Sequence, residues 1–321
     1  MQIRFWGTRG SLPVAPHATT FTDKIADALI KADGKRFADK SAALDFARTQ
    51  LDFSVGQGYG GATSCVEVDA GAGAFVVCDM GSGLREFGLD TLQRLAHGDR
   101  PKEWHFFLSH LHWDHIMGFP FFVPAFVEGA KVIIHAGHSD AEDALRRQQE
   151  EISFPVPFDW LKADIEFRTL VPGEEYQIGE LSVALIEQEH SHASYGYRFR
   201  DADGRTAIYS TDAEYKIDKM DEEAKMVAFM ADADLVIADT MYSLADSVSM
   251  KEDWGHSSNI VAVDLCHEAG AKRLALFHHE PSYSDAEIER MHAETIRYEH
   301  LTRTGSQLEV LCSYDGLCIE L

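Results

Sequence analysis

The sequence predicts an α/β fold, in which two mixed β-sheets pack face to face with helices outside, an αββα sandwich of four layers. Short apolar and β-branched runs recur along the whole chain. Amphipathic helical patterns lie between and after these runs. The 321 residues are 45% hydrophobic and 26% charged, an ordinary globular composition that can bury a large core.

The predicted strands are short and bounded by turn residues. They cover residues 2–6, 64–69, 74–79, 104–108, 131–135, 165–170, 181–186, 195–199, 205–209, 235–238, 273–277 and 307–312. Helical patterns cover residues 84–96, 140–150, 221–230, 258–268 and 286–301, and Ser284 and Glu287 have the spacing of a capping box before the last. Strands come first and then alternate with helices, which favours two packed sheets. We expect a single domain over residues 1–321.

Residues 14–59 look inserted into this pattern. They contain two amphipathic helix candidates, residues 21–31 and 41–51, and a glycine-rich exit. Long insertions are either functional or peripheral. Three roles are therefore considered for the segment, which are a lid over a site, an interface and a cover for a sheet edge. If it is an interface, the protein could form a homodimer.

The excess of acidic residues disfavours some classes of binding partner. Lys and Arg number 29 against 53 Asp and Glu, a net charge of -24, which repels polyanions and disfavours a long nucleic acid as partner. No run approaches about 18 consecutive apolar residues, and the N-terminus lacks the basic and apolar regions of a signal peptide. We expect no membrane association and a cytoplasmic location. Five cysteines without C-x-x-C spacing suit reduced, buried thiols.

One segment carries most of the chemistry. His110, His112, Asp114 and His115 lie within six positions, directly after the apolar run 104–108. His110 and His112 are two apart, so they point the same way while the backbone is extended. Asp114 and His115 can face a second centre once the chain turns. Imidazole and carboxylate are ligands that zinc and similar divalent metals accept, so the spacing predicts a metal site.

Further candidate ligands follow other predicted strands. His190 and His192 come after residues 181–186, Asp212 after residues 205–209, and His278 and its neighbour His279 after residues 273–277. Strand ends would place these groups on one rim of the sandwich, as a dinuclear site requires. The spacing alone leaves open which histidine of each pair binds a metal.

These motifs occur together with several others. They are Phe5-Trp6-Gly7-Thr8-Arg9-Gly10-Ser11, Asp79-Met80-Gly81-Ser82-Gly83, Gly196-Tyr197-Arg198, Gly255-His256-Ser257-Ser258 and His278-His279-Glu280-Pro281. With them the chain resembles the metallo-β-lactamase fold superfamily, and within it the phosphodiesterase branch that includes ribonuclease Z. The resemblance covers nearly the whole chain apart from residues 14–59.

The resemblance implies a ligand set. One metal is held by His110, His112 and His190, the other by Asp114, His115 and His278, and Asp212 bridges the two. In the family the ligands lie six residues before the glycine that matches Gly196 and three before the proline that matches Pro281, so the resemblance favours His190 over His192 and His278 over His279. The implied cofactors are two divalent ions, with Zn²⁺ first and Mn²⁺ or Fe²⁺ as alternatives.

The expected activity is hydrolysis of a small phosphodiester such as a cyclic nucleotide. Two metals would present a bridging hydroxide as nucleophile and hold the phosphoryl oxygens. Asp114 can orient that nucleophile or accept its proton, and His256 can protonate the leaving alkoxide, with Asp239 fixing its tautomer. The alternatives are transfer-RNA 3′ processing, which the net charge disfavours, and hydrolysis of thioesters or lactones, since fold alone does not determine chemistry.

Overall fold

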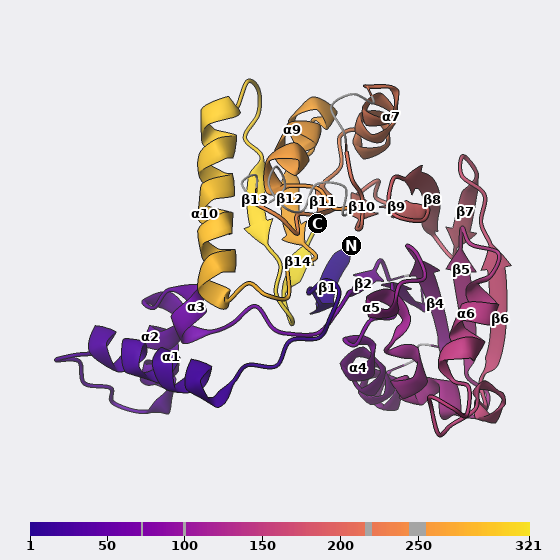
Figure 1. Ribbon diagram of the computed structural model, residues 1–321, viewed down its shortest axis with the longest axis horizontal. Helices are drawn as coiled ribbons and strands as arrows, with labels where there is room; N and C mark the ends of the chain where they lie inside the picture. Colours follow the sequence, from indigo (N-terminus) through magenta and orange to yellow (C-terminus); the bar gives the residue numbers. More distant parts are fainter. Residues whose placement is uncertain (72, 99–100, 216–219, 244–254) are drawn as a thin grey trace.

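Two seven-stranded β-sheets lie at the centre of the molecule, and helices cover their outer faces (Figure 1). The computed structural model describes residues 1–71, 73–98, 101–215, 220–243 and 255–321. In spatial order, the first sheet contains β14 (Cys318–Glu320), β1 (Gln2–Gly7), β2 (Cys65–Asp69), β3 (Phe75–Cys78), β4 (Glu103–Leu108), β5 (Lys131–Ala136) and β6 (Asp164–Thr169). The second contains β13 (Glu309–Cys312), β12 (Arg273–Phe277), β11 (Leu235–Asp239), β10 (Thr206–Ser210), β9 (Ser194–Arg200), β8 (Leu181–Gln188) and β7 (Glu175–Ile178). The predicted four-layer αββα architecture is confirmed.

Both sheets are half antiparallel and half parallel. In the first sheet the pairs from β14 to β3 are antiparallel and those from β3 to β6 are parallel. In the second, the pairs from β7 to β10 are antiparallel and those from β10 to β13 are parallel. Parallel neighbours end at the same edge of a sheet, where α/β proteins bind their ligands. The loops that follow β10, β11 and β12 therefore share one edge of the second sheet.

The core has three layers of apolar side chains. Phe5, Phe107 and Phe277 belong to the cluster between the sheets. A second cluster, which includes Trp104 and Phe106, lies between the first sheet and its helices, and a third lies beneath the helices of the second sheet. Successive residues of β4 thus enter different layers. Burial on both faces explains why the central strands are nearly continuous apolar runs.

The helices are arranged in two outer layers. On the first sheet lie α4 (Leu84–His97), α5 (Trp113–Ile116) and α6 (Ala141–Gln148), with the 3-10 turns η1 (Phe119–Phe121), η2 (Val123–Phe126) and η3 (Phe158–Trp160). On the second lie α7 (Met220–Met230), α9 (Asn259–Ala269) and α10 (Asp285–Thr302). The capping box predicted for α10 is present, because Ser284 accepts from the Glu287 amide and the Glu287 side chain accepts from Ser284. No helix in the described ranges is both long and apolar enough to span a bilayer.

All twelve predicted strands are present, within one or two residues at most ends. The two strands that were not predicted, β7 and β14, are short edge strands with exposed residues. The expectation of buried thiols was wrong for Cys318, which is exposed on β14, whereas the other four cysteines are buried. An edge strand has one side open to solvent, so apolar patterning at an edge is weak.

Residues 14–59 form an arm that extends from the body (Figure 1). It contains α1 (Ala18–Lys31), α2 (Lys40–Thr49) and α3 (Phe53–Gly56), and the first two coincide with the predicted helices. The two ends of the arm are joined where the amide of Val14 donates to the carbonyl of Gly61 at 2.8 Å. A Cβ on Gly61 would lie 1.7 Å from the Val14 carbonyl oxygen, so this close approach requires glycine.

Candidate metal centre

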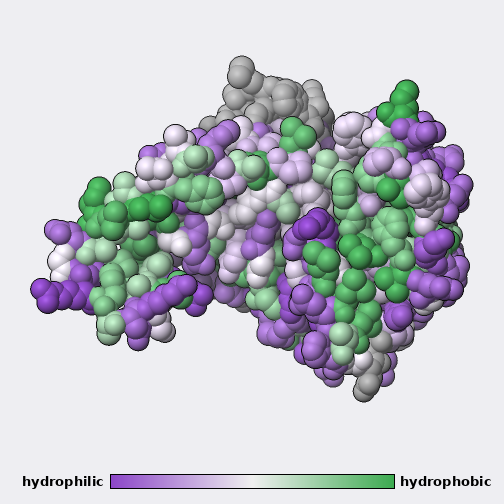
Figure 2. All heavy atoms as spheres, turned by 90° about the horizontal axis from the view of Figure 1, so that it is seen from below, coloured by the Kyte–Doolittle hydropathy of each residue, from purple (hydrophilic) through white to green (hydrophobic). Residues whose placement is uncertain are grey.

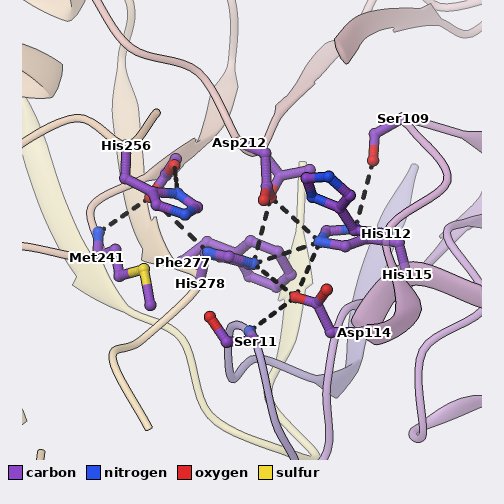
Figure 3. Close-up of polar contacts among 12 residues, drawn as sticks. Ser11, Ser109, His112, Asp114, His115, Asp212, Met241, His256, Phe277 and His278 are labelled. Atoms are coloured by element: carbon purple, nitrogen blue, oxygen red, sulfur yellow. Dashed lines mark hydrogen bonds and ion pairs between the residues drawn. The ribbon is translucent and has the colours of Figure 1, made fainter. Parts of the chain in front are cut away.

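Seven predicted ligands converge at one rim of the sandwich from both sheets. Figure 3 shows five of them, which are His112, Asp114, His115, Asp212 and His278. The loop from β4 into α5 carries His110, His112, Asp114 and His115. The ends of β8, β10 and β12 carry the others, which are His190, Asp212 and His278. The structure therefore brings together the seven residues that the resemblance implied as metal ligands.

The first group consists of His110, His112, His190 and Asp212, whose ligand atoms all lie within 4.8 Å of one another. Nε2 of His190 lies 3.2 Å from Nδ1 of His112. Oδ2 of Asp212 lies 3.6 Å from Nε2 of His110 and 3.8 Å from Nε2 of His190. Three imidazoles and one carboxylate oxygen thus surround a single point.

The second group consists of Asp114, His115, Asp212 and His278. Oδ2 of Asp114 lies 3.2 Å from Nε2 of both His115 and His278. Oδ1 of Asp212 lies 3.2 Å from the same two nitrogens. Because Oδ2 of Asp212 faces the first group and Oδ1 the second, this carboxylate lies between the two groups.

The donor set fits divalent cations. Nε2 of His110 is buried and has no hydrogen-bond partner among the residues that the structure describes, a position in which a metal would satisfy it. Burial, together with the charge of His115, holds the pKa of His110 well below its usual value, so this imidazole is neutral and able to ligate. Burial raises the pKa of Asp212, but the charges of His115 and His278 outweigh it and hold that pKa well below its usual range.

Two groups outside the ligand set hold ligands in place. Asp79 is fully buried and accepts from the Ser109 amide and hydroxyl, from Nδ1 of His115 and from the Tyr209 hydroxyl, at 2.7–2.8 Å. The other is the amide of Ser11, which was not predicted and which donates to Oδ2 of Asp114 at 2.7 Å. A backbone donor has no residue-type pattern, and the left-handed φ of 56° at Ser11 is visible only in the structure.

His256 lies beside the second group. Its Nδ1 is 2.7 Å from Oδ2 of Asp239, and Oδ1 of Asp239 accepts from the Met241 amide at 3.0 Å (Figure 3). The imidazole ring stacks on that of His278 at 5.1 Å. Burial lowers the pKa of His256, but the carboxylate of Asp239 outweighs it and raises that pKa to about 9. The expected contact of His256 with Asp239 is therefore confirmed.

The geometry shows which histidine of each neighbouring pair lies at the site. His192 is exposed and its ring lies 6.4 Å from that of His112, whereas His190 belongs to the first group. Nε2 of His279 donates to the carbonyl of Ser313 at 2.8 Å, and its ring lies outside both groups. The structure thus places His190 and His278 at the site, as the resemblance implied.

Comparison with known families agrees with this arrangement. A family described as Beta-lactamase superfamily domain matches residues 75–279, which is more than half of the chain. The chain belongs to the beta-lactamase superfamily. Ribonuclease Z from Picrophilus torridus is 21% identical to it over 238 residues, which cover 59% of this chain and 73% of that protein. The fold of this superfamily implies divalent metal ions, and the protein is a metal-dependent hydrolase.

Solved structures show the same fold. The metallo-beta-lactamase fold protein YhfI from Bacillus subtilis has a TM-score of 0.62 at 18% identity, covering 99% of this chain and 98% of its own. Unliganded yeast PDE1 has a TM-score of 0.65 at 14% identity, covering 100% of this chain and 99% of its own. At these identities the similarity establishes the architecture of this superfamily member, and its substrate must be argued from the site.

Proposed function

We propose that the protein is a dinuclear metal-dependent phosphodiesterase that acts on a small phosphodiester such as a cyclic nucleotide. The observation that carries this proposal is the pair of ligand groups that share Asp212, with the proton donor His256 beside them. A phosphodiester needs charge neutralisation at its non-bridging oxygens and a proton for its leaving oxygen. The site has residues for both tasks.

The metal ligands are assigned by position. His110, His112 and His190 would hold one ion, Asp114, His115 and His278 the other, and Asp212 both. Two bound divalent ions supply the Lewis acidity that activates water and neutralises phosphoryl charge. Zn²⁺ is the first candidate because imidazole dominates the set, and Mn²⁺ or Fe²⁺ accepts the same ligands.

The protein's own groups handle the protons. Asp114 receives the Ser11 amide on Oδ2, and its carboxylate is positioned to orient water or accept its proton. Nδ1 of His256 bonds to Asp239, so Nε2 is the nitrogen left to donate a proton to the leaving alkoxide. A base and an acid at separate positions suit in-line displacement at phosphorus.

Charge supports a small substrate. The chain carries -24 and lacks the excess of basic residues that binding to a phosphate backbone requires. The match to ribonuclease Z keeps transfer-RNA 3′ processing as the second candidate. The five free thiols suit a reducing compartment such as the cytoplasm, in which either substrate class would be met.

The test combines metal analysis with hydrolysis of bis(p-nitrophenyl) phosphate. We expect about two metals per chain in the wild type, loss of metal and activity in Asp212→Ala, and loss of activity with metal retained in His256→Ala. His192→Ala is the matched control, because His192 is exposed beside His190, and it should keep both properties. Cyclic nucleotides and a precursor transfer RNA then separate the two candidates. A metal-loaded enzyme inactive on every phosphodiester would overturn the proposal and direct attention to thioesters and lactones.

A further inference from the structure

The arm at residues 14–59 exposes an apolar surface. Helices α1, α2 and α3, all of them described, contain no buried residue. The exposed fractions of the large side chains on α1 and α2 are 55% for Phe21, 60% for Ile25, 68% for Leu29, 73% for Ile30 and 42% for Leu44. Figure 2 shows hydrophobic residues gathered on this protruding arm, at the left of the view.

The apolar side chains of α1 are spaced for helix packing. Phe21, Ile25 and Leu29 are four positions apart, so they form one ridge along the helix. Ridges of this spacing interdigitate with the same ridges of a second helix. A helix of 14 residues that packs against little is marginal in water. The ridge of α1 therefore lacks the packing that would stabilise it.

The base of the arm is fixed to the body. The Phe53 amide donates to Oε1 of Glu289 at 2.8 Å, and the Phe53 ring lies 4.8 Å from that of Tyr314. Lys24 on α1 pairs with Asp285 at the start of α10. These contacts hold α1 in one orientation with its ridge outward. Closing it over the chain's own metal centre would break them, which argues against a lid.

Charge indicates what covers the ridge. Residues 14–59 contain six Lys or Arg and six Asp, with no Glu, so the arm is neutral and the rest of the chain carries the whole net charge of -24. Two bodies of that charge repel each other, whereas two arms meet without net repulsion. The same neutrality gives no attraction to RNA or to an anionic membrane, and the body repels both.

The exposed apolar area approaches what contact with a second copy requires. The five side chains expose roughly 500 Å² per chain, of which Ile30 and Leu44 lie beside the ridge of α1. Two arms would therefore bury up to about 1,000 Å², and flanking residues must supply the rest of the ~1,200 Å² at which standard interfaces begin. A two-fold contact uses the same patch on both chains, so the self-complementary ridge of α1 meets this requirement.

We infer that the arm is a homodimer interface, in which α1 of one copy packs against α1 of the other. The inference is independent of the reaction proposed above, because it rests on the arm alone. Dimerisation would remove the apolar ridge from water and leave the two acidic bodies apart.

The experiment is sedimentation velocity and light scattering on the full-length, metal-loaded protein at micromolar concentration. We expect twice the mass of one chain for the wild type. The Ile25→Asp/Leu29→Asp double variant places charges in the ridge and should raise the dimer dissociation constant by at least about 100-fold. Ile152→Asp is the matched control, because Ile152 is 94% exposed on the body, and it should stay dimeric.

Circular dichroism and hydrolysis of bis(p-nitrophenyl) phosphate establish that the double variant is folded, since it changes no residue of the metal centre. A monomeric wild type, or a double variant as dimeric as the wild type, would overturn the inference. A monomeric wild type that binds anionic phosphatidylserine vesicles would assign the ridge to a membrane surface instead.

Discussion

Nδ1 of His115 lies 2.7 Å from Oδ2 of Asp79, and this contact directs Nε2 of His115 toward Asp114 and Asp212. Asp79 therefore fixes the ring orientation and tautomer of His115, a proposed metal ligand, through the nitrogen that faces away from the candidate metal centre. The other acceptor bonds of Asp79 tie the same carboxylate to Ser109 and Tyr209. One buried carboxylate thus connects the metal loop of the first sheet to a strand of the second.

Asp79→Asn should weaken metal binding about 10- to 100-fold, the range for groups that orient ligands. An amide offers one acceptor oxygen and a donor group in place of a four-fold acceptor, so at least one buried partner loses its bond. The affinity is measured by competition with a chromogenic chelator. Asp159→Asn is the control, because that side chain is 83% exposed, and it should bind metal as the wild type does.

The rate should fall at alkaline pH as His256 loses its proton. An acid catalyst works only below its pKa, which is about 9 for His256, so the pH–rate profile should have an alkaline limb. The positive charge of bound metals lowers the pKa of His256 and moves this limb to lower pH. His256→Ala should lower kcat by about 10²- to 10⁴-fold and remove this limb. Asp239→Asn should move the limb to lower pH, because the carboxylate raises the pKa of His256. An unchanged alkaline limb in His256→Ala would exclude His256 as the acid.

Gly10→Ala should disturb the second ligand group. A Cβ at Gly10 would lie 2.6 Å from Cε1 and Nδ1 of His278, so the imidazole must move. We expect at least about a tenfold loss of metal affinity, comparable to that for groups that orient ligands. Gly305→Ala is the control, because no atom lies within 4 Å of its added Cβ. Equal metal content and affinity in the two variants would contradict this role for Gly10.

Stability should decline with acid through buried neutral histidines. Burial lowers the pKa of His135, and that of His279, to about 3. The unfolded chain therefore binds more protons than the folded one between about pH 6.5 and 3, and the free energy of unfolding falls as pH falls through this window. His135→Phe should reduce this slope by up to about 1.4 kcal/mol per pH unit, measured by urea unfolding. Exposed His300, replaced in the same way, should leave the slope unchanged.

The strands and the convergence of the candidate ligands could be predicted from the sequence, whereas the backbone contacts of those ligands could not. His110, His112, Asp114 and His115 follow a strongly apolar strand, so both the strand end and the ligand types are visible in one segment. The contact of Ser11 with Asp114 was not predictable, because a backbone amide has no residue-specific pattern.

The aromatic segment after the metal loop shows a second limit. Residues 119–126 divide between core and surface, because Phe121 is 53% exposed and Val123 is 38% exposed, while Phe119 and Phe122 are buried. Two 3-10 turns alternate these side chains between core and solvent. Composition alone does not reveal such a change of backbone periodicity.

The ligands of the second group come from both sheets. His115 follows β4 and His278 follows β12, 163 positions further along the chain, and their Nε2 atoms lie 3.3 Å apart. A cation bound by both histidines would link the two sheets of the sandwich without a covalent bond. Removing the metal with a chelator should therefore lower the Tm and speed proteolysis, in addition to stopping catalysis. A cell short of metal would then lose the folded protein as well as its catalytic activity.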